Sequence, residues 1–349
     1  MSALSSDALS QAGAGLTARG WRVFGVWLAA LLLVPTVADS YFLSVLTTLL
    51  WFAYLGQAWN VMMGFAGQLS LGHSLYVGLG AYSAAALFVH FGIGPWAGVW
   101  LGMLVAALAG AAIGVLGFRF RVRGVYFALL TIAFAELTRI GFSHISWLGG
   151  AGGLFLPVSQ RVNNDLAGLR GTPAMFYYVI LVLTLAALLL CRWLLGRRIG
   201  YYWQAIREDQ EAAQALGIDV FRYKLAAVLI SAAMTAVGGV FYAFFYNNLF
   251  PEQIFSLSRS IEIILDVLIG GIGTLFGPVF GGFVLTPLGE LLTWSLDRAG
   301  INIPGAKQFV YGGVLVAIVI FLPDGIWPPL ARRLGLTRAS SDLVRSSEP

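Results

Sequence analysis

One uninterrupted apolar run of the sequence, from Pro95 to Gly117, reads PWAGVWLGMLVAALAGAAIGVLG. It contains no Asp, Glu, Lys or Arg. A helix that crosses the hydrocarbon core of a bilayer needs about 20 mostly apolar residues, and this run supplies that length. The charge-free stretch around it extends from Ser40 to Phe118, which is long enough for three such helices.

The composition of the whole chain places it among the polytopic integral membrane proteins. Of its 349 residues, 59% are hydrophobic and 11% are charged, whereas a soluble domain carries about 25% charged residues. The net charge of +5 comes from cations beside apolar spans, so the lipid bilayer explains it and nucleic acid is not expected as a partner. The single cysteine, Cys191, excludes a disulfide framework within the chain.

Applied along the chain, the 20-residue rule predicts an all-α polytopic membrane protein with about ten transmembrane helices. The expected spans are 22–38, 41–63, 73–91, 95–117, 124–145, 173–195, 225–247, 259–275, 277–297 and 304–322. They define a transmembrane domain at 21–325 that contains a polar loop at 196–224. A disordered N-terminal tail at 1–20 and a C-terminal tail at 326–349 flank this domain, and both are expected to be cytoplasmic.

The distribution of basic residues supports this topology. With the N-terminus inside, 15 of the 21 Lys and Arg residues lie in predicted cytoplasmic segments, and five lie on the opposite side. Positive residues concentrate in cytoplasmic loops, so the pattern indicates that both termini are cytoplasmic. It also places the loop 196–224 in the cytoplasm.

Two glycine-rich stretches, Gly64–Gly72 and Gly270–Gly282, interrupt the apolar pattern and predict broken or re-entrant helices. Unwound backbone at membrane depth is tolerated only where protein or a water-filled path satisfies it. In a transporter, the translocation path is therefore expected near these breaks. The candidate path residues are Gly67, Ser70, His73, Glu262, Gly273 and Thr274. Close packing of small residues explains the glycines as well, and Ser and Thr also serve as turn or cap residues.

Motifs for chemistry are missing from the sequence. Neither of the two lysines, Lys224 and Lys307, stands in a P-loop motif, so another chain must bind any ATP that drives this protein. One Cys and three scattered His residues form no metal-ligand set. No catalytic residue, metal or cofactor is expected, and the protein is not expected to be an enzyme.

Ionisable residues within the predicted spans are candidates for a functional role by default. Glu136 and Arg139 are three residues apart on one helical face, so an intramembrane ion pair is expected. A structural pair is at least as good an interpretation, because nothing in the spans resembles a proton relay. An ion-coupled secondary transporter that uses Glu136, Arg139 or Glu262 remains an alternative from another functional class.

The polar island from Trp203 to Gly217 reads WQAIREDQEAAQALG. Its periodicity predicts one short amphipathic helix that stops at Gly217. One predicted face holds Ile206, Ala212, Ala213 and Leu216, and the other holds Arg207, Glu208, Glu211 and Gln214. Because the apolar residues are small and acids outnumber bases over 207–211, docking on a partner protein is favoured over binding to anionic lipid.

Four stretches of the sequence carry a family resemblance: Ala205 to Lys224, GQLSLGHS from Gly67, RGVYFALLTIAFAE from Arg123, and IGGIGTLFGP from Ile269. They resemble the permeases for branched-chain amino acids in importers of the ABC class, specifically the M-type subunit. The likeness runs from about residue 40 to residue 325. Urea and short-amide permeases are similar, so the motifs are more specific for the family than for the substrate.

The resemblance implies a permease subunit in the bacterial inner membrane. It implies a related second permease subunit, two ATPase subunits that dock on the helix at 203–217, and a periplasmic substrate-binding protein. The expected ATPase-coupling residues are Arg207, Glu208, Asp209, Glu211, Ala212, Ala213, Leu216 and Gly217. The sequence departs from the family at Gly149–Gly153, where a polar residue or Pro more often follows the paired Gly.

Overall fold

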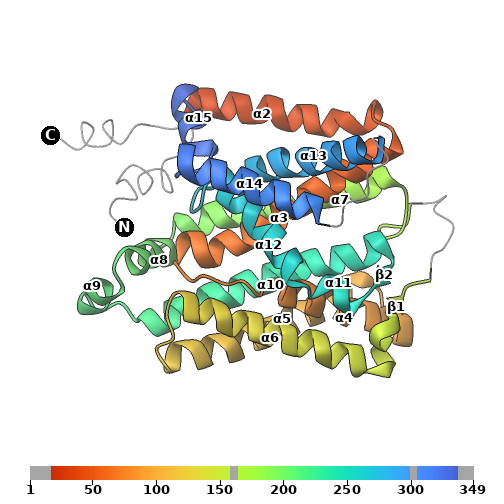
Figure 1. The fold of residues 1–349 in the computed structure, drawn as a ribbon, viewed down its shortest axis with the longest axis horizontal. Helices are drawn as coiled ribbons and strands as arrows, with labels where there is room; N and C mark the ends of the chain where they lie inside the picture. Colours follow the sequence, from red (N-terminus) through yellow and green to blue (C-terminus); the bar gives the residue numbers. More distant parts are fainter. Residues whose placement is uncertain (1–16, 158–163, 299–304, 337–349) are drawn as a thin grey trace.

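The computed structural model describes residues 17–157, 164–298 and 305–336, which fold into a bundle of long helices (Figure 1). The α-helices are α2 (Ala18–Leu33), α3 (Ser40–Asn60), α4 (Ser74–Phe91), α5 (Pro95–Arg119), α6 (Val125–His144), α7 (Pro173–Leu195), α8 (Arg198–Glu208), α9 (Gln210–Ala215), α10 (Val220–Tyr246), α11 (Pro251–Ile254), α12 (Leu257–Gly270), α13 (Gly277–Arg298), α14 (Ala306–Phe321) and α15 (Trp327–Arg333). The predicted all-α fold is confirmed.

Short elements complete the described chain. A π-helical turn, η2 (Val61–Phe65), extends α3, and 3₁₀ turns occur at η1 (Val34–Thr36), η3 (Ser146–Leu148) and η4 (Gly150–Gly152). Two strands of two residues each, β1 (Leu154–Phe155) and β2 (Asn248–Leu249), pair antiparallel. This pairing ties the loop after α6 to the loop after α10.

Local sequence explains several helix ends. The side chains of Thr17 and Asp39 cap α2 and α3 by accepting hydrogen bonds from the N–H groups of Gly20 and Phe42, at 3.1 and 2.9 Å. Pro95 begins α5, where a missing N–H costs no intrahelical hydrogen bond. Gly92 ends α4 with a φ of 66°, the left-handed conformation that glycine adopts without strain.

Seven helices of the described chain are long and apolar enough to cross a membrane, and they match seven of the ten predicted spans. These helices cover Ser40–Phe65, Ser74–Phe91, Pro95–Arg119, Val125–His144, Pro173–Leu195, Val220–Tyr246 and Gly277–Leu296. The predicted spans 22–38, 259–275 and 304–322 correspond to α2, α12 and α14, which have 16, 14 and 16 residues. Because these are shorter than about 20 residues, the total of ten stays a prediction.

Close packing of α4 against α10 forms the centre of the bundle. No Cβ would fit at Gly80 or Gly239, because the backbone carbonyls of Ala236 and Val77 lie directly against them. Small residues allow this approach of two helix backbones, as in other membrane helix pairs. The aromatic rings of Trp59 and Tyr82 fill the adjacent core and are almost completely buried.

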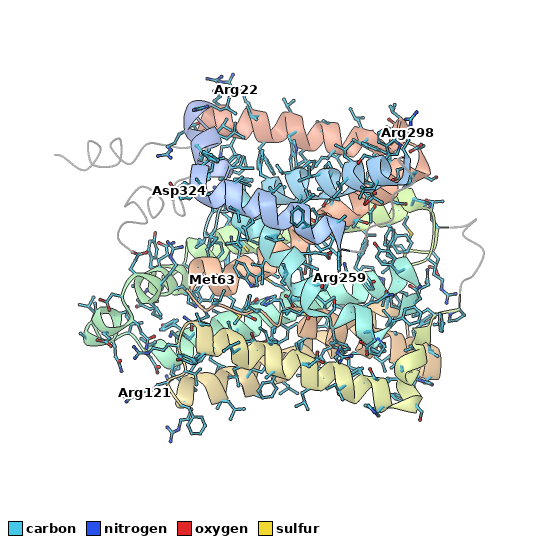
Figure 2. All side chains as sticks on the ribbon, in the orientation of Figure 1. Arg22, Met63, Arg121, Arg259, Arg298 and Asp324 are labelled. Carbon is cyan, nitrogen blue, oxygen red and sulfur yellow. The ribbon has the colours of Figure 1, made fainter. Side chains whose placement is uncertain are left out.

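Large apolar side chains cover the outer faces of α5 and α6. Trp100 is 71% exposed and Tyr126 is 76% exposed. The charged Arg22, Arg121 and Arg298 project instead from the margins of the bundle (Figure 2). Soluble proteins rarely expose apolar surface so extensively, so these faces suit contact with lipid or with another membrane subunit.

Both ends of the described chain lie at the same end of the bundle as α8 and α9 (Figure 1). The N–H of Thr17 donates to the carbonyl oxygen of Leu336 at 2.9 Å. The Trp327 ring of α15 packs on Phe280, with ring centroids 4.5 Å apart. The beginning of the predicted C-terminal tail is therefore part of the bundle. Residues 1–16 and 337–349 lie outside the described residues, and the side of the membrane stays a prediction.

Candidate coupling site at the glycine-rich breaks

The polar island at 203–217 belongs to two helices rather than one. α8 ends at Glu208, Asp209 is extended with φ −147° and ψ 109°, and α9 begins at Gln210. The Asp209 carboxylate accepts hydrogen bonds from the N–H groups of Glu211 and Ala212, at 2.8 and 3.0 Å. The predicted continuous helix is wrong because Asp is a strong N-cap and starts a second helix here. We call this unit the α8–α9 hairpin.

The predicted apolar face of this segment is half correct. Ile206 and Ala213 are buried and form a small cluster with Val220. Leu216, however, is 82% exposed, and Ala212 is exposed as well. The extended backbone of Asp209 interrupts the helical register, so residues that would share one face of a continuous helix are separated.

α9 stops at a left-handed glycine, as the sequence predicts. Gly217 has a φ of 84°, and its N–H donates to the carbonyl oxygen of Gln214 at 3.0 Å. The N–H of Ile218 donates to the carbonyl oxygen of Ala213 at 3.1 Å. The two hydrogen bonds satisfy carbonyl groups that the end of a helix otherwise leaves unpaired.

Arg207 points from α8 into the bundle, so its predicted place on the exposed docking face is wrong. Its side chain is 15% exposed and lies 3.5 Å from the Glu208 carboxylate. Its guanidinium donates to the carbonyl oxygen of Gly64 in the first glycine-rich stretch. A Cβ at Gly67 would lie 3.0 Å from the Arg207 Cγ, and a Cβ at Gly273 would collide with the guanidinium. Arg207 therefore contacts both glycine-rich stretches.

The two glycine-rich stretches meet beside Asn60. Their irregular backbone covers residues 66–73 and 271–276, and the second stretch is shorter than predicted because α13 begins at Gly277. The Asn60 side chain accepts a hydrogen bond from the N–H of Gly273 at 2.8 Å and donates one to the carbonyl oxygen of Thr274 at 2.9 Å. One amide thus satisfies backbone groups that an interrupted helix leaves unpaired. We call residues 66–73 and 271–276 the two breaks.

Three candidate path residues are buried and hydrogen-bonded within the protein. His73 Nε2 lies 2.9 Å from Ser231 Oγ, and His73 Nδ1 lies 3.3 Å from Ser70 Oγ. Thr274 Oγ1 accepts from the N–H of Gly277 at 3.1 Å and donates to the carbonyl oxygen of Gly271 at 2.8 Å. Thr274 has the geometry of a turn and cap residue, whereas His73 links the first glycine-rich stretch to Ser231 of α10.

The ionisable candidates form pairs on their own helices. Arg139 Nε lies 3.0 Å from both carboxylate oxygens of Glu136, and the Arg139 guanidinium also pairs with Glu252 of α11. On α12, Glu262 pairs with Arg259 at 3.3 Å. Such spacing of three residues is typical of pairs that stabilise a helix, and the structural interpretation explains both.

Sequence reasoning missed the residues that hold the breaks together. Gln57, Asn60 and Ser231 are all fully buried, and each donates a hydrogen bond to a backbone carbonyl. The sequence signal that could have identified them is a polar side chain within an apolar span, because a polar group buried away from water needs a hydrogen-bond partner. Within 17–157, 164–298 and 305–336, no three His, Cys, Asp or Glu side chains gather to hold a metal ion.

The apolar helices, the joined breaks and the polar hairpin define the class as a helical membrane protein with a projecting polar hairpin. The family model for the permease component of branched-chain amino acid transport systems matches residues 41–319. The chain belongs to this family, and the resemblance found in its sequence motifs is confirmed.

Individual relatives agree with this assignment. The LivM permease protein of the high-affinity branched-chain amino acid transport system of Escherichia coli (strain K12) is 29% identical, over 89% of this chain and 76% of the relative. A probable LivM of Methanocaldococcus jannaschii is 22% identical, over 80% of this chain and 92% of the relative. The E. coli LivH permease protein is 25% identical, over 79% of this chain and 90% of the relative. No solved structure matches the chain significantly.

Proposed function

We propose that this chain is one of two related permease subunits of an ABC importer that carries branched-chain amino acids across the bacterial inner membrane. Its membership of the permease family and its similarity to both LivM and LivH proteins support this proposal. The complete importer would add two ATPase subunits and a periplasmic substrate-binding protein. Both termini and the α8–α9 hairpin would lie in the cytoplasm, and the permease itself would hydrolyse no ATP.

The exposed part of the hairpin would be the surface on which an ATPase subunit docks. Glu208, Asp209, Glu211, Ala212 and Leu216 are all exposed there, while Ala213 holds α9 to the bundle. Exposed carboxylates can receive charge-assisted hydrogen bonds from a partner, and small residues permit close approach. Gly217 then ends the docking helix sharply.

The observation that carries the proposal is the position of Arg207. It belongs to α8 but contacts Gly67 and Gly273 in the two breaks, and it donates to the carbonyl oxygen of Gly64 just before the first break. A displacement of the hairpin by the closing ATPase subunits would therefore move the backbone at both breaks together. Because the Arg207 cation is largely buried and bonded to a carbonyl, it would transmit this movement better than a flexible surface contact.

Reconstitution of the complete importer in liposomes tests this role. We expect Arg207→Gln to reduce ATP-driven uptake of labelled leucine by about tenfold or more, since a hydrogen bond from a charged group is lost. ATPase binding and ATP hydrolysis should persist, because the exposed surface of α9 is unchanged. Arg222→Gln is the matched control, since the Arg222 side chain is 83% exposed and pairs with Asp219 at 2.9 Å.

Two results would count against the proposal. Uptake by the purified chain alone, driven by an ion gradient, would favour a secondary transporter that uses Glu136, Arg139 or Glu262. Competition of leucine uptake by urea or short amides, with no competition by isoleucine or valine, would favour the related urea and amide permeases.

A further inference from the structure

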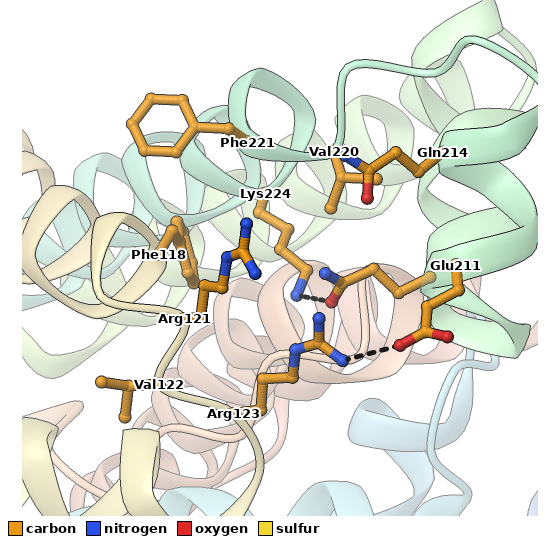
Figure 3. Close-up of a pocket in the computed structure, with 10 residues that line it drawn as sticks. Phe118, Arg121, Val122, Arg123, Glu211, Gln214, Val220, Phe221 and Lys224 are labelled. Atoms are coloured by element: carbon orange, nitrogen blue, oxygen red, sulfur yellow. Dashed lines mark hydrogen bonds and ion pairs between the residues drawn. The ribbon is translucent and has the colours of Figure 1, made fainter.

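A basic pocket lies between the α5–α6 connection and the α8–α9 hairpin (Figure 3). Its volume is about 310 Å³, and it is lined by Phe118, Arg121, Val122, Arg123, Gln210, Glu211, Gln214, Val220, Phe221 and Lys224. Arg121 and Arg123 of the α5–α6 connection and Lys224 of α10 converge on it, and Glu211 is the only carboxylate in its lining. The basic pocket therefore carries a net positive charge.

Lys224 is a buried cation with a neutral hydrogen-bond partner. It is 6% exposed, its Nζ donates to Gln210 Oε1, and this nitrogen lies 5.5 Å from the centre of the Phe118 ring. Burying an ammonium group is costly unless an opposite charge compensates it. Within the described chain, no carboxylate pairs with Lys224. An anion in the pocket would supply the missing charge.

Arg121 occupies a strained backbone position at the rim of this pocket. Its φ is 55°. The N–H of Arg121 donates to the carbonyl oxygen of Phe118, and the N–H of Val122 donates to the carbonyl oxygen of Gly117. This is the position after a helix end where glycine is usual, because a Cβ is unfavourable there. An arginine here keeps a guanidinium beside Lys224 despite that strain, which is typical of functional positions.

The carboxylate in the pocket is only weakly engaged. Arg123 lies 3.4 Å from Glu211, and the two side chains are 52% and 80% exposed. Water screens an exposed pair of this kind, so it holds the two groups only loosely. Arg123 is therefore available to a stronger anion that enters the pocket.

Apolar side chains beside the pocket indicate the source of the anion. Phe120 on the α5–α6 connection is 74% exposed, and Val125 and Tyr126 at the start of α6 are 66% and 76% exposed. They lie at the end of the apolar faces of α5 and α6. A molecule with a phosphate and an acyl chain would therefore bind the basic pocket and these apolar side chains together. Basic pockets at the cytoplasmic ends of membrane helices bind anionic headgroups in this way.

We propose that the basic pocket binds the headgroup phosphate of an anionic phospholipid of the cytoplasmic leaflet. The phosphate oxygens accept hydrogen bonds from Arg121, Arg123 and Lys224, and the acyl chains lie along Phe120 and Tyr126. The lipid thereby links the α5–α6 connection to the base of α9. The choice of the cytoplasmic leaflet rests on the topology proposed above, but the occupant is a bilayer component, so the inference does not depend on the transported substrate.

Native mass spectrometry of the delipidated full chain in detergent tests the site. The probes are phosphatidylglycerol, phosphatidylcholine and inorganic phosphate. We expect preferential binding of phosphatidylglycerol, and we expect Arg121→Gln to weaken it by about fivefold, the effect of one basic residue at a membrane surface. Arg119→Gln removes the same charge two residues away, outside the pocket lining, and should leave binding nearly unchanged.

Arg121→Gly separates a functional site from a structural one. We expect glycine to raise the midpoint of thermal unfolding in the absence of lipid, because it relieves the strain at φ 55°. It should weaken phosphatidylglycerol binding as much as Arg121→Gln does. A lower midpoint together with unchanged lipid binding would overturn the proposal.

Other outcomes are equally decisive. Equal binding of phosphatidylcholine and phosphatidylglycerol would exclude recognition of the headgroup charge, and tighter binding of inorganic phosphate would exclude a lipid. Loss of ATPase binding in Arg121→Gln with unchanged lipid binding would show that the pocket receives a protein side chain instead.

Discussion

The two arms of the α8–α9 hairpin lie next to each other in the sequence but differ in what they contact. α8 directs Trp203, Ile206 and Arg207 toward the bundle, and the indole of Trp203 donates to the carbonyl oxygen of Tyr223 at 2.8 Å. α9 buries Ala213 alone and exposes Glu211, and Leu216 directly after α9 is exposed as well. The first arm is built like a core element and the second like a binding surface.

In the coupling role proposed above, this difference would separate two tasks of the hairpin. A docking surface has to stay accessible, whereas a transmitting element has to be held rigidly by what it moves. Asp209 makes both possible within one short segment, because its extended backbone allows the two helices to take different directions. Substitutions in α8 should therefore affect folding and transmission, and substitutions in α9 should affect docking.

The largest effect is expected at Trp203. The residue is fully buried and hydrogen-bonded, so Trp203→Ala should lower the unfolding free energy by about 3–5 kcal/mol, as for other large-to-small core substitutions. Thermal or denaturant unfolding of the purified protein in detergent measures this change. A change of less than about 1 kcal/mol would mean that α8 is not anchored as a core element.

A smaller effect on stability, with a clear effect on transport, is expected at Gly67. Gly67→Ala places a side chain at a φ of 68°, which costs about 1–2 kcal/mol, and presses its Cβ against Arg207. Gly92→Ala is the matched control, because its φ is 66° and no atom lies within 4 Å of a Cβ there. In unfolding experiments, Gly92→Ala should lose only the stability that its φ costs, and Gly67→Ala should lose at least as much because of the added contact with Arg207. Leucine uptake should fall in Gly67→Ala alone, and equal uptake in both would show that contact with Arg207 is unimportant.

The smallest effect on stability is expected at Glu211. The side chain is 80% exposed, so Glu211→Lys should change the unfolding free energy by less than about 0.5 kcal/mol. Reversal of the charge should nevertheless prevent productive docking and abolish ATP-driven uptake and the stimulation of ATP hydrolysis. Co-purification with the ATPase subunits measures docking, and reconstituted liposomes measure uptake and the stimulation of ATP hydrolysis. Normal uptake would place the docking surface elsewhere.

Much of the fold was predictable because membrane insertion leaves a strong pattern in sequence. The seven long helices coincide with predicted spans, since a bilayer demands long apolar runs whatever the tertiary contacts. Gly217 was predictable for a similarly local reason, because the left-handed conformation at a helix end favours glycine. The pair of Glu136 and Arg139 followed from helical spacing alone.

The candidate site was less predictable because its geometry depends on distant contacts. Periodicity assigned Arg207 to an outward face, but the side chain is drawn inward by a carbonyl group at Gly64, 143 positions away in sequence. Asn60 reaches the second break across a separation of 213 residues. No local pattern records which backbone groups an interrupted helix will leave unpaired.

The sequence by itself determined that this is a polytopic helical membrane protein of the branched-chain amino acid permease family, with a polar segment at 203–217 between apolar helices. These properties depend on composition, helical period and local motifs. Only the tertiary structure decided that the segment is divided at Asp209, that Arg207 joins the two breaks, and that three cations converge on one pocket. The physical reason is that buried polar groups must find partners, and packing brings those partners from far along the chain.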